Sequence, residues 1–208
     1  MSDLERNARY LDERVEESAV QLEARRAALE LGLRPIPPVA GSLLATLAAS
    51  VGAMRILELG GGVGTTTLWL RRGAPEASLT VLEEQGDYSA QARRHLLDAG
   101  ARPAALRFIA GSPAVLERMS DAYYDLVVLA DDPVRFPARL RHALRLARQG
   151  GTIAALGALR GSMVADPARR DPITSGMRAI IDELEQHPDF SVAVLPIAGG
   201  LLLITKLP

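Results

Sequence analysis

The sequence predicts an α/β fold: a doubly wound sheet that is mostly parallel, with an antiparallel hairpin at its C-terminal end and helices at its N-terminus. Short apolar runs alternate with amphipathic stretches from residue 55 onward, which is the order of strands and helices in a parallel sheet. The run at 126–129 is apolar without interruption, as expected for a strand that helices cover on both faces. Two further apolar runs near the C-terminus are joined by Gly199-Gly200, which favours a hairpin.

Each element follows from its local pattern. Residues 3–31 carry a narrow apolar stripe among many charges, which predicts one or two helices, and three prolines end this run. Further helices are predicted at 39–51, 65–72, 88–100, 135–147 and 173–186. Strands are predicted at 55–59, 79–83, 106–110, 125–129, 152–156, 191–196 and 201–206, with a turn at 149–151. We expect residues 1–208 to form one domain, in which residues 1–36 are a helical N-terminal extension.

The composition narrows the class of protein. Hydrophobic residues make up 48% of the 208 residues and aromatic residues only 4%, so the core must be aliphatic. The 24 Lys and Arg nearly balance the 25 Asp and Glu, which gives no reason to expect a nucleic-acid partner. There is no cysteine, so disulfides and thiolate metal sites are excluded and a cytoplasmic location is expected. Residues 1–26 lack the apolar core of a signal peptide, and no apolar stretch is long enough to span a membrane.

A glycine-rich turn between a predicted strand and a predicted helix is the most informative segment. Residues 58–66 read ELGGGVGTT, with Gly60, Gly62 and Gly64 at alternate positions. Glycine lets a ligand approach main-chain atoms closely, and ligands of such sheets bind at the carboxyl ends of the strands. A dinucleotide fingerprint would require Gly or Ala where this chain has Thr65. The spacing after the acidic Glu58 is instead typical of methyltransferases, and a carboxylate suits the cationic cofactor S-adenosylmethionine.

Other polar residues are predicted to complete a cofactor site. Glu83 ends the second strand, where an acid can accept hydrogen bonds from both ribose hydroxyls. Glu84 competes for this role, although strand alternation is expected to point it the other way. Thr66 opens the helix after the glycine turn. Gly111 and Ser112 follow the third strand and are expected to flank the adenine.

These motifs resemble the catechol and caffeoyl-CoA type O-methyltransferases, with small actinobacterial members most similar. The resemblance runs from about residue 37 to the C-terminus. It rests on ELGGGVG at 58–64, YDLVVL at 124–129, GGTI at 150–153, and VADP at 164–167 followed by Arg170-Asp171. It implies a Rossmann-like fold with a closing antiparallel hairpin. It also implies methyl transfer from S-adenosylmethionine to an oxygen of a small molecule.

The chain departs from this family at the metal site. In metal-dependent members, strand four ends in a metal-binding Asp, a catalytic Lys stands three places later, and an Asp-Asn pair follows strand five. The corresponding residues here are Ala130, Pro133, Leu156 and Gly157, and their side chains offer no oxygen ligands. We therefore expect no functional magnesium or calcium site.

Asp131 and Asp132 lie beside the vacated metal position. Either carboxylate is a candidate general base for a hydroxyl acceptor, and Asp131 is also a candidate cofactor contact. The alternative is an Asp-Asp-Pro turn in which a carboxylate only caps the helix that starts near residue 135. The favoured function is O-methylation of a small molecule without a metal. The alternatives are a non-catalytic protein that binds S-adenosylmethionine or S-adenosylhomocysteine, and an NAD(P)-dependent enzyme.

The remaining polar and aromatic residues are expected to have no chemical role. His95, His142 and His187 are interpreted as surface residues, and Trp69 as a packing residue. An arginine run on one helix is interpreted as a solvated face; it comprises Arg139, Arg141, Arg145 and Arg148. Asp166 is a weak candidate for substrate contact. The N-terminal helices together with residues 39–51 are expected to form a homodimer interface.

Overall fold

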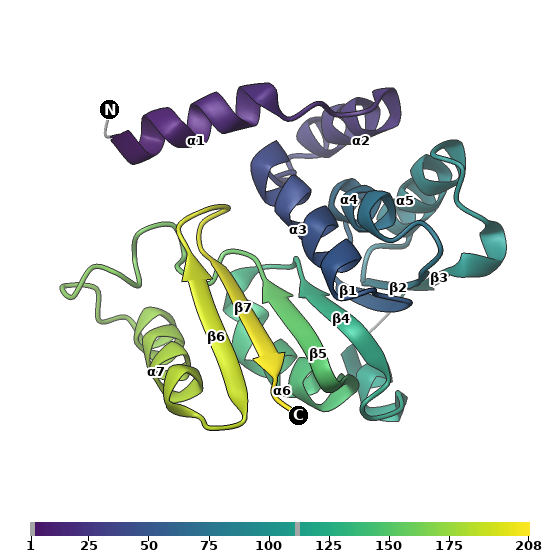
Figure 1. Cartoon of the computed structure of the whole chain (residues 1–208). Coiled ribbons are helices and arrows are strands. Elements are labelled where there is room, and N and C mark those ends of the chain that lie inside the picture. Colours follow the sequence, from purple (N-terminus) through teal and green to yellow (C-terminus); the bar gives the residue numbers. More distant parts are fainter. Residues whose placement is uncertain (1–2, 111–112) are drawn as a thin grey trace.

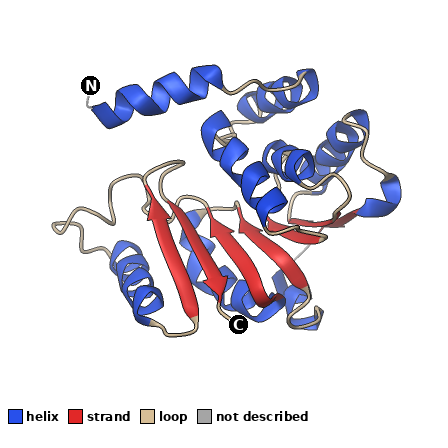
Figure 2. Ribbon diagram, in the orientation of Figure 1, coloured by secondary structure: helices blue, strands red, loops and turns tan. Residues whose placement is uncertain are grey.

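The computed structural model describes residues 3–110 and 113–208 and contains one seven-stranded sheet (Figure 1, Figure 2). The strands are β1 (Arg55–Leu59), β2 (Ser78–Glu83), β3 (Leu106–Ala110), β4 (Tyr124–Leu129), β5 (Ala147–Ala155), β6 (Phe190–Leu195) and β7 (Leu201–Lys206). Their order across the sheet is β3-β2-β1-β4-β5-β7-β6. Strands β1 to β5 run parallel, and β7 pairs antiparallel with both β5 and β6. The predicted sheet and its closing hairpin are confirmed.

Helices cover both faces of this sheet. The α-helices are α1 (Asp3–Arg14), α2 (Ala19–Glu30), α3 (Pro38–Ser50), α4 (Thr65–Gly73), α5 (Gly86–Asp98), α6 (Phe136–Leu146) and α7 (Pro172–Gln186). Short 3₁₀ helices are η1 (Pro103–Ala105), η2 (Pro113–Arg118) and η3 (Pro133–Arg135). Among the described residues, no helix is both long enough and apolar enough to cross a membrane.

Two aliphatic cores result from the alternation of side chains along the strands. On β4, Val128 packs into the core under α2 to α5, and Val127 packs into the core under α6 and α7. All six residues of β4 are buried. A strand that is buried on both faces needs apolar residues at successive positions, which is why its sequence shows no polar alternation.

The N-terminal extension consists of two helices that are tied to the domain. The break between them falls at Ser18, whose side chain caps α2 in a reciprocal pair with Gln21. The carboxylate of Asp12 on α1 accepts a hydrogen bond from the backbone N–H of Val39 at the start of α3 (2.9 Å). The guanidinium of Arg25 bridges the carboxylate of Glu17 and the carbonyl oxygen of Ile36. The chain between α2 and α3 is thereby held in place.

Strand β5 begins earlier than the sequence suggests, so the predicted turn at 149–151 is wrong. Ala147 already pairs with Tyr124, and the register shifts before Leu126 pairs with Thr152. The extra residues form an irregularity in the ladder, where Gly150 adopts a φ of +71°. Glycines in such a bulge resemble a turn in sequence, since both conformations require positive φ.

The tight packing of α3 on α4 leads to a test of stability. A Cβ on Gly41 of α3 would lie 2.3 Å from Nε1 of Trp69, a buried residue of α4. A Cβ on Gly176 of α7 would meet no atom within 4 Å. Overpacking costs about 1–3 kcal/mol, so Gly41→Ala should destabilise the fold. Gly176→Ala should stabilise it by about 0.5–1 kcal/mol, because glycine is a poor helix former. Urea unfolding checks both variants, and shifts of the same sign would contradict this account of the packing.

Candidate functional site

The glycine turn after β1 has the conformation that its glycines permit. Gly60, Gly62 and Gly64 have φ values of +84°, +51° and +93°. A Cβ on Gly60 would lie 2.3 Å from the Cβ of Asp131, so this position must be glycine for the ends of β1 and β4 to meet. Gly64 is the left-handed residue directly before α4. The turn therefore leaves main-chain atoms exposed at the carboxyl ends of the central strands.

Glu58 lies buried beneath this turn. Its side chain is 1% exposed, and its Oε2 accepts a hydrogen bond from the Thr67 hydroxyl at 2.5 Å. Its Oε1 is buried without a partner among the described residues. Burial, reinforced by the nearby Glu83 carboxylate and opposed by the Thr67 hydrogen bond, raises the pKa of Glu58 to about 7. Glu58 therefore holds its proton at a much higher pH than an exposed glutamate does, and its Oε1 makes no hydrogen bond within the described residues.

Glu83 holds the turn from the neighbouring strand. Its Oε2 accepts a hydrogen bond from the backbone N–H of Gly62 at 2.8 Å, and its Oε1 accepts one from the N–H of Gln85 at 3.0 Å. Each carboxylate oxygen keeps a second lone pair for a ligand. Glu84 follows the last residue of β2, and its carboxylate binds Arg135 and Arg139 rather than the glycine turn. Both acids line the same pocket.

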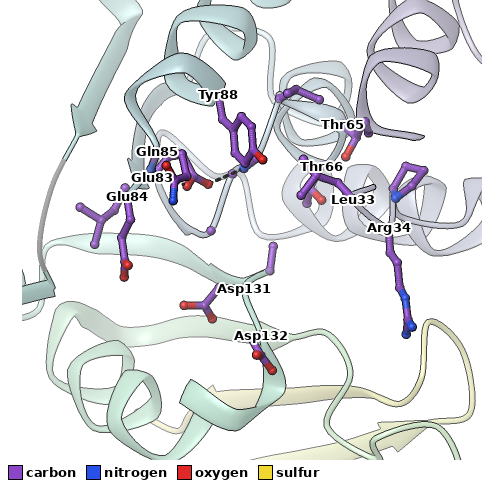
Figure 3. A pocket seen from close by; sticks show the side chains of 18 of the residues that line it. Leu33, Arg34, Thr65, Thr66, Glu83, Glu84, Gln85, Tyr88, Asp131 and Asp132 are labelled. Atoms are coloured by element: carbon purple, nitrogen blue, oxygen red, sulfur yellow. Dashed lines mark hydrogen bonds between the residues drawn. The ribbon is translucent and has the colours of Figure 1, made fainter. Parts of the chain in front are cut away.

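The pocket has a volume of about 620 Å³ and lies over the glycine turn (Figure 3). Thr65 and Thr66 line it from the start of α4, and Glu83 lines it from the end of β2. The segment 32–35 between α2 and α3 lines it as well, with Leu33 lying over Gly62. The sequence analysis did not predict that this segment lines a pocket. The only local signal was the cluster of three prolines at its end, which indicates the end of a helix. Gly111 and Ser112, the predicted adenine contacts, lie outside the described residues.

An ion cluster forms one wall of the pocket and corrects the interpretation of the arginine run. Arg139 is 3% exposed and therefore does not belong to a solvated face. Its Nε donates to Asp131 Oδ2 at 2.8 Å, and its Nη2 donates to Glu84 Oε1 at 3.0 Å. Arg135 binds the same Glu84 oxygen. Arg141, by contrast, is exposed as expected. The periodicity of the helix alone does not predict which arginine of this run lines the pocket.

The two neighbouring aspartates have different environments. Asp131 is partly buried between Gly60 and Arg139, and burial raises its pKa against the opposing effect of Arg139. Asp132 is exposed, and its Oδ1 accepts a hydrogen bond from the backbone N–H of Val134, which caps η3. Asp132 thus caps a 3₁₀ turn, whereas α6, the helix that starts near residue 135, has no side-chain cap hydrogen bond at its N-cap Arg135. Both residues line the pocket.

The residues at the family's metal position form an apolar contact instead. A Cβ on Gly157 would lie 2.6 Å from Cγ of Pro133, so the proline ring packs directly on this glycine. Among the described residues, no group of three or more His, Asp or Glu side chains could hold a metal ion. The side chains at this position do not supply the oxygen ligands that a magnesium ion requires.

Several residues outside the pocket have simple structural roles. The surface interpretation of His95 is wrong, because this ring is 7% exposed and its Nδ1 lies 2.8 Å from the carbonyl oxygen of Val63. His142 and His187 are partly exposed, and Trp69 is buried in the core as expected. Asp166 is exposed, and its carboxylate accepts a hydrogen bond from the N–H of Ala168. It does not line the pocket.

Comparison with known proteins gives a consistent result. The family model described as O-methyltransferase matches residues 10–207. A protein of Mycobacteroides abscessus that carries the name O-methyltransferase is 31% identical over 194 residues, which cover 92% of this chain and 90% of that protein. A crystal structure of a Corynebacterium glutamicum protein has a TM-score of 0.91 at 28% identity and covers 100% of this chain and 98% of that one. The O-methyltransferase TomG of Streptomyces achromogenes, solved in complex with S-adenosylmethionine, has a TM-score of 0.84 at 25% identity and complete coverage of both chains.

The raised pKa of Glu58 predicts a pH dependence of stability. Between its ordinary value of 4.5 and about 7, the folded state keeps the proton on Glu58 while the unfolded state releases it. The free energy of unfolding should therefore fall as the pH rises through this range, by about 3 kcal/mol in total, since one pKa unit corresponds to about 1.4 kcal/mol. Glu58→Gln has no such proton to lose. Urea unfolding at several pH values gives the difference between wild type and variant, and a difference that does not change with pH would contradict the prediction.

Proposed function

Because the chain belongs to the O-methyltransferase family, we propose that it transfers a methyl group from S-adenosylmethionine to an oxygen of a small molecule. The observation that carries the proposal is the pocket over the glycine turn, with the Glu83 carboxylate at its edge. Each oxygen of Glu83 keeps a lone pair, and the ribose of the cofactor needs such acceptors. Glu58 lies beneath the turn and is not among the residues that line the pocket; its carboxyl accepts a hydrogen bond from Thr67.

Different residues of the turn are proposed to bind different parts of the cofactor. Gly60 and Gly62 line the pocket and let the cofactor approach the backbone, and Glu83 accepts hydrogen bonds from its ribose. Gly64, also a predicted contact, is not among the lining residues and packs on Ala92 of α5. The N-terminus of α4, with Thr66, suits its carboxylate, since free N–H groups and the helix dipole favour an anion there. Asp131 contacts it from the end of β4, where Gly60 admits that side chain. Gly111 and Ser112 stay predicted adenine contacts.

Transfer then depends on placing the acceptor oxygen in line with the methyl group. The bound cofactor supplies a methyl group on a positively charged sulfur, which is an electrophile that needs no further activation. Close and aligned placement can supply much of the rate. Of the two candidate bases, Asp131 already forms an ion pair with Arg139. We therefore propose that the exposed Asp132 accepts the proton of a hydroxyl acceptor. Its Oδ1 accepts a hydrogen bond from the N–H of Val134, which leaves Oδ2 for this role.

Ligand-induced stabilisation tests the proposed function. S-adenosylhomocysteine at a hundredfold excess over its Kd should stabilise the protein by about 2.7 kcal/mol and raise its Tm by roughly 5–10 °C, because it binds only the folded state. NAD should have no effect. Glu83→Gln should weaken binding about tenfold or more through lost hydrogen bonds to a charged group, and the matched surface variant Glu76→Gln should not. A wild-type protein that ignores S-adenosylhomocysteine would remove the proposal.

Catalysis needs a second measurement. Radiolabelled S-adenosylmethionine, incubated with pure protein and a cell extract, should pass its label to a small molecule. Reproducible absence of transfer, with cofactor binding intact, would favour the non-catalytic alternative.

We further propose that transfer requires no divalent metal. Ala130 and the contact between Pro133 and Gly157 leave no oxygen donors at the family's metal position. Label transfer should therefore be unchanged by EDTA, and calorimetry should detect no micromolar binding of magnesium. A loss of activity with EDTA that magnesium restores would refute this proposal.

A homodimer and a cytoplasmic location complete the proposal. Several large apolar side chains of the N-terminal helices are exposed, namely Tyr10, Leu11, Leu22 and Leu29. Burying them against a second copy would remove this surface from water. Light scattering should give twice the mass of one chain, and Leu22→Asp with Leu29→Asp should lower it. A wild-type protein that is only monomeric would rule out the dimer.

A further inference from the structure

One of the three arginines that line the pocket has no partner. Arg135 and Arg139 both bind Glu84, and Arg139 also binds Asp131. The third lining arginine, Arg34, is exposed and makes no hydrogen bond or ion pair with any other residue that the structure describes. Its guanidinium group is therefore available to a ligand.

The backbone of Arg34 is held on both sides. Before it, the N–H of Leu33 donates to the carbonyl oxygen of Ala28 at 2.8 Å, which closes the end of α2. After it, Pro35 favours an extended backbone at Arg34, and Ile36 is buried in the core. The Arg34 side chain thus projects from a fixed segment, and its charge stays at this edge of the pocket.

The Arg34 side chain is directed to the part of the pocket proposed for the methyl acceptor. It extends away from Thr65 at the start of α4 and toward the end of the pocket that carries Asp132 (Figure 3). Asp132 is the residue that we propose to take the acceptor's proton. At the family's metal position, Pro133 packs on Gly157 instead of coordinating a cation. The positive charge near the proposed acceptor is therefore that of Arg34.

A free guanidinium near the proposed base suits an acceptor with two functional groups. A guanidinium binds a carboxylate or a phosphate through two parallel hydrogen bonds. An anionic group on Arg34 and a hydroxyl directed at Asp132 would fix the acceptor at two points, and such placement raises the rate of transfer. We infer that Arg34 is a specificity-determining residue and that the acceptor is a small molecule with a carboxylate or phosphate group. This inference rests on the proposed function.

Binding of the cofactor's carboxylate is the alternative role for Arg34. The N-terminus of α4 already offers free N–H groups to that carboxylate, and Arg34 extends away from this helix end (Figure 3). The two roles predict different results. Loss of a cofactor contact would lower the affinity for S-adenosylhomocysteine, whereas loss of an acceptor contact would leave this affinity unchanged and slow the transfer.

The first test examines the charge of the methylated product. Wild-type protein is incubated with radiolabelled S-adenosylmethionine and a cell extract. The labelled product should be retained on an anion exchanger at about pH 8, where carboxylates and phosphates are charged. Phosphatase treatment should abolish this retention for a phosphate ester and leave it unchanged for a carboxylate. A labelled product that is not retained would overturn the inference, whereas the absence of any labelled product would refute the proposed transfer itself.

The second test assigns this selectivity to Arg34. With the extract diluted until the acceptor is limiting, Arg34→Gln should lower the rate of label transfer about tenfold, as expected for the loss of a hydrogen bond to a charged group. Arg34→Lys keeps the charge and should retain most of the rate. Arg26→Gln is the matched control, because Arg26 is exposed on α2 and does not line the pocket.

Two further readouts separate an acceptor contact from a structural role. Calorimetry should give the same affinity for S-adenosylhomocysteine in the wild type and in Arg34→Gln. Added salt should slow the wild type more than Arg34→Gln, because salt screens an exposed ion pair. An undiminished rate of transfer in Arg34→Gln, or a weakened affinity for S-adenosylhomocysteine, would overturn the assignment.

Discussion

The close approach of Gly60 to Asp131 is the contact on which the site depends. It brings the ends of β1 and β4 together at a distance that no other residue at position 60 permits. Glu83 then fixes the same turn from β2 through the N–H of Gly62. Three adjacent strands thus share one small region at their carboxyl ends. A change in this contact would displace the backbone that forms the pocket floor, so its effects would extend beyond the two residues.

Charge in the pocket is mostly compensated within the protein. Glu83 accepts two backbone N–H groups, Asp132 accepts one, and Arg139 neutralises Asp131 and Glu84. Burying an ion pair is rarely a net gain in stability, since the desolvation of both charges opposes their attraction. This cluster is therefore not a strong source of stability, although removing one partner would leave the other partly buried charge uncompensated.

The sequence predicts well what local chemistry determines. The apolar run of β4 and the glycine spacing after β1 follow from backbone requirements, and both appear in the structure. Glu83, predicted from the chemistry of a ribose contact, ends β2 as expected. Side-chain partners were less predictable. His95 and Arg139 lie on helices whose outer faces are charged, and only the tertiary contacts with Val63 and Asp131 show that these two residues face inward. The pocket segment 32–35 is distant in sequence from the turn it covers, so no periodicity could reveal it.

At the family's metal position this chain differs in its packing as well as in its ligands. A divalent ion would have to displace the Pro133 ring from Gly157, and restoring a carboxylate at position 130 alone would not create room for it. Gly157 itself has a φ of +73°, which an Asp or Asn side chain adopts less readily than glycine does. The backbone, the proline ring and the missing donors are together the basis of our proposal that transfer requires no metal. Without a metal the acceptor must be oriented by the shape of the pocket and by hydrogen bonds, and Asp132 and Arg34 are the charged groups that we assign to the acceptor.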